Sequence, residues 1–133
     1  MIISFSVFRE KIESGEKNQT IRKFNDLRYL SLCNAKKYQL YWQQPRNGGT
    51  LIKEVEPSIA PFVVMFDRNP AAPLIQVCET GLQSFYPTSQ RQLAKNDGFD
   101  TPEDLFRWFY EKYGEDLFNQ KFMVIRWMVG GLA

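Results

Sequence analysis

The stretch Ser14-Gly15-Glu16-Lys17-Asn18-Gln19-Thr20-Ile21-Arg22 decides the fold around the most reactive residues of the chain. Its glycine is typical of the left-handed residue that ends a helix, and the residues after it alternate as in a strand. Thr20 and Arg22 are two positions apart, so their side chains face the same side of that strand. A hydroxyl beside a guanidinium is suited to contact a phosphate, a carboxylate or a planar base. We therefore expect a binding site on this strand.

The residues before Gly15 predict a strand over residues 2–6 and then a helix over residues 7–14. Phe8 and Ile12 are four positions apart and would share the buried face of this helix. We therefore expect the helix to end at the glycine and to lead directly into the second strand.

That second strand is predicted over residues 17–23. Ile21 would face the core, whereas Thr20 and Arg22 would face away from it. Lys17 and Thr20 are three positions apart, so they would point to opposite sides of a regular strand. We therefore expect Lys17 in the loop after the glycine or on a β-bulge.

The rest of the chain predicts further short strands and then helices. The expected elements are a short helix or turn over 25–32, an aromatic strand over 36–43, a loop or hairpin tip over 45–49, strands over 62–66 and 74–80, a helix over 89–94, a turn at Asp97-Gly98, a helix that Thr101 caps and that ends at Gly114, and a strand over 122–127. Short, mostly antiparallel strands with a few flanking helices indicate an α+β fold built on a small open or closed β-barrel. We expect residues 1–133 to form one such domain.

The composition limits the chemistry. Hydrophobic residues make up 44% of the chain, which indicates a globular protein. The net charge of +2 gives only weak support for nucleic-acid binding, so any basic surface has to be local. Histidine is absent, which removes imidazole base catalysis and most zinc and iron sites, and we expect neither a metal nor a cofactor. Cys33 and Cys78 lack a CxxC partner, and we expect reduced, buried thiols.

The hydropathy pattern predicts no membrane partner. No stretch approaches the roughly 18 apolar residues of a membrane-spanning helix. The first residues become charged too soon for a signal peptide. We therefore expect a cytoplasmic protein, and the sequence leaves its oligomeric state open between a monomer and a weak dimer.

Three blocks of the sequence resemble the ASCH domain family. The run 14–22 resembles its signature of a small residue, Gly, any residue, Lys, two residues, Thr, Ile or Val, and Arg. The segment 97–109 resembles the family's DGF turn and the helix after it, and Val124-Ile125-Arg126-Trp127 resembles its closing IRW strand. The aromatic strand over 36–43 lies where the family has a barrel strand. Together the blocks cover nearly the whole chain, and they are most similar to the phage and prophage branch.

This resemblance implies a PUA-like β-barrel with a cleft beside the signature strand, and binding of RNA, a nucleotide or a modified nucleoside. A small bacterial branch of the family hydrolyses N4-acetylcytidine with a lysine, a threonine and an acidic residue. By motif, these catalytic roles fall on Lys17, Thr20 and Asp97. That branch carries glutamate where this chain has Asp97, whose side chain is one methylene shorter and reaches less far.

Further ligand contacts are assigned to Gly15, Arg22, Arg126 and Trp127. Arg22 is suited to hold a carbonyl or a phosphate through its planar guanidinium. Purely structural roles are the alternatives for the others: Arg126 as a charge at the rim of the barrel, and Trp127 as a core residue.

The triad also has structural alternatives. Lys17 can complement the C-terminus of the helix before it, and Asp97 can shape a turn. In the catalytic alternative, a lysine whose pKa is lowered by burial takes the proton of Thr20. Two functions therefore stay open, a binding module for RNA or nucleotides and an amidohydrolase for N4-acylated cytidine.

Overall fold

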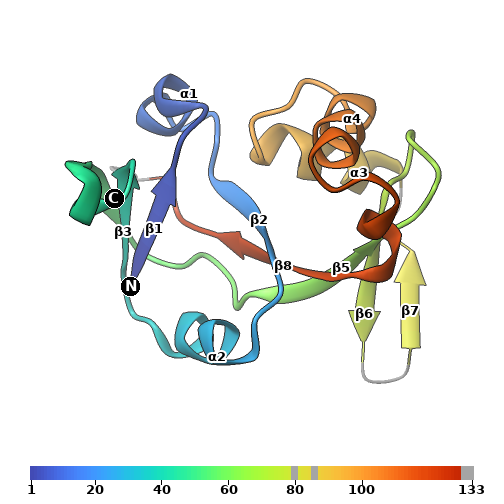
Figure 1. The fold of residues 1–133 in the computed structure, drawn as a ribbon, viewed down its shortest axis with the longest axis horizontal. Coiled ribbons are helices and arrows are strands. Elements are labelled where there is room, and N and C mark those ends of the chain that lie inside the picture. The colour runs from blue at the N-terminus through green and yellow to red at the C-terminus, as the bar shows by residue number, and fades with distance from the viewer. Residues whose placement is uncertain (79–80, 85–86, 130–133) are drawn as a thin grey trace.

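The computed structural model describes residues 1–78, 81–84 and 87–129, in which helices separate the first strands, four strands then follow in succession, and helices precede the last strand (Figure 1). The elements are β1 (Ile2–Phe5), α1 (Arg9–Ser14), β2 (Gln19–Lys23), α2 (Asp26–Asn34), β3 (Tyr38–Trp42), the 3₁₀-helix η1 (Pro45–Asn47), β4 (Thr50–Val55), β5 (Phe62–Phe66), β6 (Leu74–Cys78), β7 (Gly81–Ser84), α3 (Pro87–Asn96), α4 (Pro102–Tyr113), the 3₁₀-helix η2 (Gly114–Asn119) and β8 (Lys121–Arg126). The predicted α+β class is confirmed.

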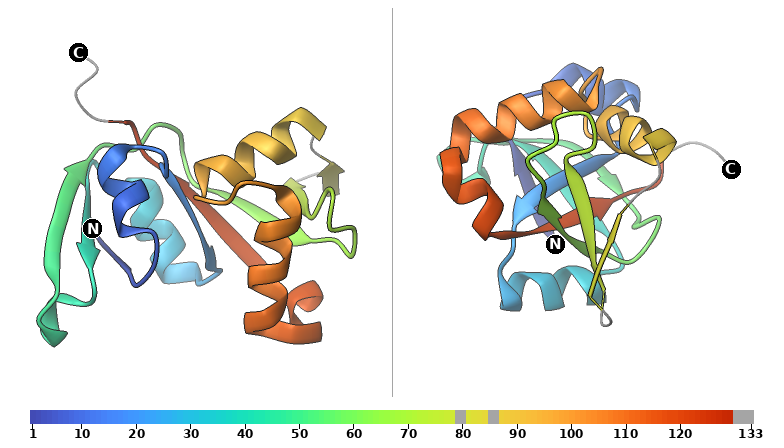
Figure 2. Two further views of the ribbon diagram at one scale, coloured as in Figure 1. Left: turned by 90° about the horizontal axis from the view of Figure 1, so that it is seen from above. Right: turned by 90° about the vertical axis from the view of Figure 1, so that its right-hand side faces the viewer.

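The described strands form two sheets. One is three-stranded, in the order β1-β3-β4, with β1 parallel to β3 and β3 antiparallel to β4. The other is five-stranded and antiparallel, in the order β2-β8-β5-β6-β7. The three-stranded sheet and the β6–β7 hairpin lie at opposite ends of the molecule, with β2 and β8 between them (Figure 2). No closed barrel is found among these strands.

Strand β8 is the centre of the fold because both of its faces are buried. Phe122 and Val124 belong to a core that the five-stranded sheet forms with α3, α4 and η2. Met123 and Ile125 point to the opposite face and belong to a second core, shared with β1, β3 and β4. Alternate side chains of a strand point to opposite faces, so a strand between two layers becomes an apolar run. Burial of each such side chain contributes about 2 kcal/mol.

Most of the predicted elements are confirmed, because their signals are local. Gly15 ends α1 with a φ of 87°. The Thr101 hydroxyl caps α4 by accepting a hydrogen bond of 3.1 Å from the amide of Asp104. The helix predicted over 89–94 extends over Pro87–Asn96, and the strand predicted over 74–80 is β6, whose last two predicted residues lie outside the described ones.

Other predictions are missing or wrong. Strands β4 and β7 were not predicted, although β4 completes a hairpin with β3 and β7 forms an edge of the larger sheet. The prediction of two buried thiols is wrong, since Cys33 is exposed on α2 and Cys78 is partly exposed at the end of β6. In α2 Leu32 is buried in the core, whereas the next residue, Cys33, is exposed.

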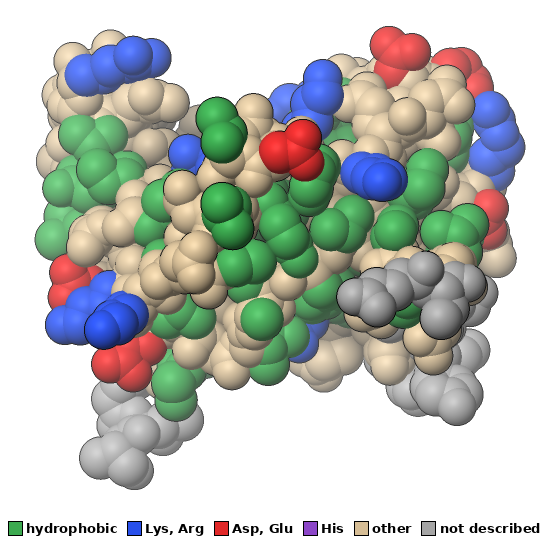
Figure 3. All heavy atoms as spheres, turned by 90° about the horizontal axis from the view of Figure 1, so that it is seen from below, with side chains coloured by type: hydrophobic (Ala, Val, Ile, Leu, Met, Phe, Trp, Pro, Cys, Tyr) green, Lys and Arg blue, Asp and Glu red, His purple; other side chains and the backbone are tan. Residues whose placement is uncertain are grey.

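The surface on the side of α2 is rich in apolar side chains. Hydrophobic side chains gather across the middle of the face in Figure 3. In α2 itself, Leu27 is 79% exposed and Leu30 is 61% exposed. No helix in the described part of the chain is long and apolar enough to cross a membrane.

Candidate functional site

A small cavity lies where β1, β2, the α3–α4 turn and α4 meet. Its volume is about 130 Å³. Six aromatic side chains help to line it, from β1 and the loop after it, from the α3–α4 turn and from α4: Phe5, Phe8, Phe99, Trp108, Phe109 and Tyr113. Four polar side chains reach the same cavity from β2, the segment before it and the end of α3: Lys17, Thr20, Arg22 and Asp97. All three residues of the predicted triad, together with Arg22, are therefore brought to one place.

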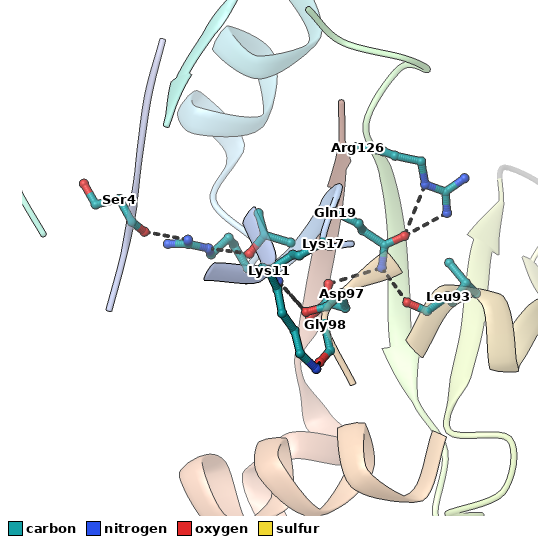
Figure 4. A network of polar contacts seen from close by, with 10 residues as sticks. Ser4, Lys11, Lys17, Gln19, Leu93, Asp97, Gly98 and Arg126 are labelled. Atoms are coloured by element: carbon teal, nitrogen blue, oxygen red, sulfur yellow. Dashed lines mark hydrogen bonds and ion pairs between the residues drawn. The ribbon is translucent and has the colours of Figure 1, made fainter. Parts of the chain in front are cut away.

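Lys17 lies in the loop between α1 and β2, as predicted from its spacing to Thr20. Its backbone N–H donates to the carbonyl of Lys11 at 2.9 Å, and the next amide, of Asn18, donates to the carbonyl of Asn96 at 2.9 Å. These bonds fix the loop between the ends of α1 and α3. The Lys17 residue is only 3% exposed, and its Nζ donates to the backbone oxygen of Asp97 at 2.5 Å (Figure 4).

Asp97 follows the last turn of α3. Its amide donates to the carbonyl of Leu93 at 3.2 Å, and Gly98 continues with a φ of 100°, which ends the helix in the left-handed conformation. A Cβ on Gly98 would lie 3.2 Å from the Phe8 ring and 3.4 Å from Cδ of Lys17, which is a tight contact, and the φ of 100° favours glycine there. Lys17 thus complements a helix C-terminus, but that of α3 rather than that of α1.

The Lys17 and Asp97 side chains form a buried ion pair with a long contact. The Nζ atom lies 3.6 Å from Oδ2 of Asp97, and the two side chains are 4% and 5% exposed. This distance exceeds that of a hydrogen bond. The ammonium donates instead to the backbone oxygen of Asp97.

Burial opposes charge on both members of this pair. It lowers the pKa of Lys17, while the Asp97 carboxylate raises it and the Arg22 guanidinium lowers it further. Burial raises the pKa of Asp97, and the ammonium of Lys17 and the amide of Gln19 act in the opposite direction. Lys17 is therefore more easily deprotonated than a surface lysine.

Thr20 and Arg22 lie on the same face of β2, as predicted. Arg22 Nε donates to Oγ1 of Thr20 at 3.0 Å, and Arg22 Nη2 donates to the carbonyl of Ser4 at 2.6 Å. The guanidinium also lies over the Phe5 ring, 4.9 Å from its centroid. Since the Thr20 hydroxyl accepts from Arg22, its own proton is left for another acceptor. Burial lowers the pKa of Arg22 to about 10, so it is protonated at neutral pH.

Thr20 is more buried than an outward-facing strand residue. It is 5% exposed, as Ile21 is on the other face of β2. The sequence predicted one buried face for β2, but the three-stranded sheet covers the second face. Thr20 and Arg22 therefore lie between layers and not on an open surface.

Gln19 was not singled out from the sequence, yet it connects the site to the rest of the sheet. It is fully buried, and its Nε2 donates to Oδ1 of Asp97 at 3.2 Å and to the carbonyl of Leu93 at 3.1 Å. Its Oε1 accepts from Arg126 Nε at 3.2 Å and from Nη2 at 2.8 Å. Figure 4 shows the resulting chain from Arg126 through Gln19 to Asp97 and Lys17. The sequence signal that could have identified Gln19 is a polar amide at a strand position that is buried.

Three predicted ligand residues do not line this cavity. Gly15 caps α1, and a Cβ there would lie 2.8 Å from Val129 Cγ1. Trp127 is 1% exposed in the second core, edge-on to Phe5 with ring centroids 5.9 Å apart. Arg126 lines a separate cavity of about 470 Å³ on the side of β5 and α3.

The cavity holds groups suited to polar recognition and to acid–base chemistry. No group of three or more Cys, Asp or Glu side chains that could hold a metal ion occurs within residues 1–78, 81–84 and 87–129. The cavity combines one buried acid, one buried amine, a hydroxyl and a guanidinium with aromatic walls.

The comparisons with known proteins add no family. No family model matches the chain, and neither a curated protein nor a solved structure matches it.

Proposed function

We propose that this chain is an ASCH-like domain of PUA-like architecture that binds a nucleotide or a modified nucleoside, free or within RNA, in the cavity beside β2. The observation that carries the proposal is the convergence of Lys17, Thr20, Arg22 and Asp97 on one aromatic-lined cavity. The two sheets, which share a core on one face of β8, are the elements from which such a barrel would be built.

The size of the cavity supports a single six-membered ring as the buried part of the ligand. An engineered protein cavity of about 150 Å³ accommodates benzene. The cavity here is about 130 Å³, so it has room for a pyrimidine ring and not for a whole nucleoside. The sugar would then lie outside, towards solvent.

The polar groups match the edge of a modified pyrimidine. The Thr20 hydroxyl has a proton to donate, and the Arg22 guanidinium keeps N–H groups beyond those that bind Thr20 and Ser4. Both suit the carbonyl oxygens of a base or of an acyl group on it. The aromatic walls, Phe5 and Phe8 among them, suit stacking, which contributes about 1–3 kcal/mol for each base.

The second candidate is an amidohydrolase acting on N4-acylated cytidine. It is favoured by the lowered pKa of Lys17, because a neutral amine can accept the proton of Thr20 or of water. Activated water would add to the acyl carbon, the C–N bond would break, and Lys17 would return the proton to N4, which releases cytidine and the carboxylic acid. If Thr20 adds first, the same steps release cytidine and leave an acyl ester on Thr20, which a water then hydrolyses to the free acid. The distance of 3.6 Å between Lys17 Nζ and Asp97 Oδ2 ranks this candidate second.

Two experiments test these functions. Calorimetric titration at low salt with N4-acetylcytidine and with short RNAs tests binding, and no detectable heat or competition for any of them would refute it. Incubation with N4-acetylcytidine tests hydrolysis by comparing the wild type with Thr20→Ala. Hydrolysis predicts loss of turnover in the variant, and equal background turnover in both proteins would exclude it.

A further inference from the structure

We propose that the ligand carries phosphate, and that its phosphate groups lie in a basic groove that begins at Arg22 and leads away from the cavity. This inference rests on the proposed function, since it extends the same ligand. The groove lies between β1, β2, α2 and the segment 44–46, and its volume is about 510 Å³. It is several times larger than the cavity, as expected for the part of a nucleotide or strand outside a base pocket.

The cavity and the groove meet at two shared residues, Ser4 and Arg22. The hydrogen bond of 2.6 Å between Arg22 Nη2 and the Ser4 carbonyl spans the boundary between them. A ligand with its base in the cavity would therefore pass this guanidinium before it reaches the groove. Sugar and phosphate are the groups that follow the base in a nucleotide.

The charge of the groove is of one sign. Its basic side chains are Arg22, Lys23, Arg28 and Arg46, and no aspartate or glutamate lines it. In the described part of the chain none of the four forms an ion pair. Burial lowers the pKa of Arg22 most, the like charge of Arg28 lowers it further, and the Asp97 carboxylate opposes both. Bound phosphate would relieve the repulsion between these like charges.

Two of these arginines are held in place by the backbone of β1. Arg28 Nη2 donates to the carbonyl of Ile2 at 2.9 Å, and Arg22 donates to that of Ser4. Each bond uses part of a guanidinium, and the remaining N–H groups stay available. Fixing a long side chain before binding reduces the entropy lost on binding. Arg46 and Lys23 are exposed and add charge along the same groove.

The net charge of the chain fits a local site of this kind. At +2 it does not steer nucleic acid to the molecule as a whole. Four cations line the groove, and no acidic side chain does, so the positive potential is concentrated beside the cavity. Phosphate groups of a mononucleotide or of an RNA strand share the chemistry that this groove recognises, and the probes below separate the two.

Calorimetric titration with four probes tests the inference. These are N4-acetylcytidine, its 5′- and 3′-monophosphates, and a six-nucleotide RNA with one N4-acetylcytidine. We expect at least one monophosphate to bind about tenfold more tightly than the nucleoside at low salt, and the RNA to bind more tightly still if a strand is the ligand. Each phosphate contact of a single strand adds about 0.7 to the slope of log K against log salt.

The double variant Lys23→Glu/Arg46→Glu locates the effect, with Arg91→Glu/Lys95→Glu as a control of equal charge change on the exposed side of α3. In the groove variant, the phosphorylated probes should no longer bind more tightly than the nucleoside. The affinity for the nucleoside itself should change by less than about twofold. The control should keep both the gain from phosphate and the nucleoside affinity. Circular dichroism establishes that each variant is folded.

Three outcomes overturn the proposals, and they are distinguishable. If the nucleoside binds as tightly as every phosphorylated probe, the groove proposal fails and the cavity stands. If both double variants lose the gain equally, the effect is general charge and the groove proposal fails. If phosphorylated probes bind but the nucleoside does not, and Thr20→Val has no effect, the proposed function of the cavity fails.

Discussion

The side-chain amide of Gln19 donates a hydrogen bond of 3.2 Å to the carboxylate of Asp97, although the two residues are 78 positions apart. This bond joins the start of β2 to the end of α3 inside the protein. It also gives the carboxylate a donor besides Lys17. Lys17, Asp97, Gln19 and Arg126 therefore form one buried network, and its members stabilise one another.

Replacement of Gln19 by leucine should destabilise the fold. The change removes the donor of Asp97 Oδ1, whereas the Leu93 carbonyl keeps its bond from the Asp97 amide. A buried group without a partner costs about 1–3 kcal/mol. Urea denaturation measures the loss, with Gln92→Leu, on the exposed face of α3, as control. A free energy of unfolding unchanged within about 0.5 kcal/mol in Gln19→Leu would contradict the role of the network.

Removing one member of the Lys17–Asp97 pair should lower the free energy of unfolding strongly, whereas removing both members should lower it little. Lys17→Met leaves the Asp97 carboxylate buried without its cation, and Asp97→Asn leaves the Lys17 ammonium without its anion. We expect each to lower the free energy of unfolding by about 3–5 kcal/mol. The double variant should regain most of this loss, because no unpaired charge is left.

The stability of the double variant can also contradict this coupling. If the losses of the two single variants simply add in the double variant, the residues are not coupled. Recovery of stability together with loss of ligand binding would show that the pair is present for binding.

The pair should also give stability a characteristic pH dependence. Because the folded chain holds Asp97 with a raised pKa, it binds more protons than the unfolded chain above the ordinary value of 3.8, and stability falls as pH rises there. Because Lys17 has a lowered pKa, the unfolded chain binds more protons below 10.5, and stability rises again as pH approaches that value.

Thermal or urea unfolding across this range measures the effect as the difference between the wild type and Lys17→Met/Asp97→Asn. We expect the wild type to lose stability relative to the double variant above pH 3.8 and to regain it towards pH 10.5. Parallel curves would mean that neither residue has a shifted pKa.

Arg22→Lys should weaken the site although the charge is kept. The Arg22 guanidinium binds Thr20 through Nε and the Ser4 carbonyl through Nη2, and a single lysine ammonium does not reproduce this planar arrangement of donors. We expect the affinity for N4-acetylcytidine 5′-monophosphate to fall about tenfold, or about 1.4 kcal/mol. Arg91→Lys, on the exposed side of α3, is the matched control. Equal affinity of both variants would mean that Arg22 acts only as a point charge.

Local features could be predicted from the sequence because their signals lie within a few residues. The left-handed Gly15, the cap at Thr101 and the loop position of Lys17 each follow from spacing and backbone preference. The convergence of Lys17, Thr20 and Asp97 was expected from the family resemblance and not from any local pattern.

Features that depend on distant parts of the chain could not be predicted. Gln19 is an ordinary polar residue until α3 folds over it and supplies Asp97 and the Leu93 carbonyl. Strand β4 contains Lys53 and Glu54, which mask its pattern, and it forms because β3 offers an edge to pair with. The burial of Thr20 likewise follows from a second sheet that no short segment reveals.

The most direct test of the central claim is a two-dimensional ¹H–¹⁵N NMR titration with N4-acetylcytidine 5′-monophosphate. The claim is that this ligand binds in the cavity formed by β2, the α3–α4 turn and α4. The account predicts that the largest shifts occur at the amides of Thr20, Arg22, Gly98 and Phe99. Shifts confined to Ser89, Gln92 and Asn96, which line the separate cavity beside Arg126, or no shifts at saturating ligand, would contradict it.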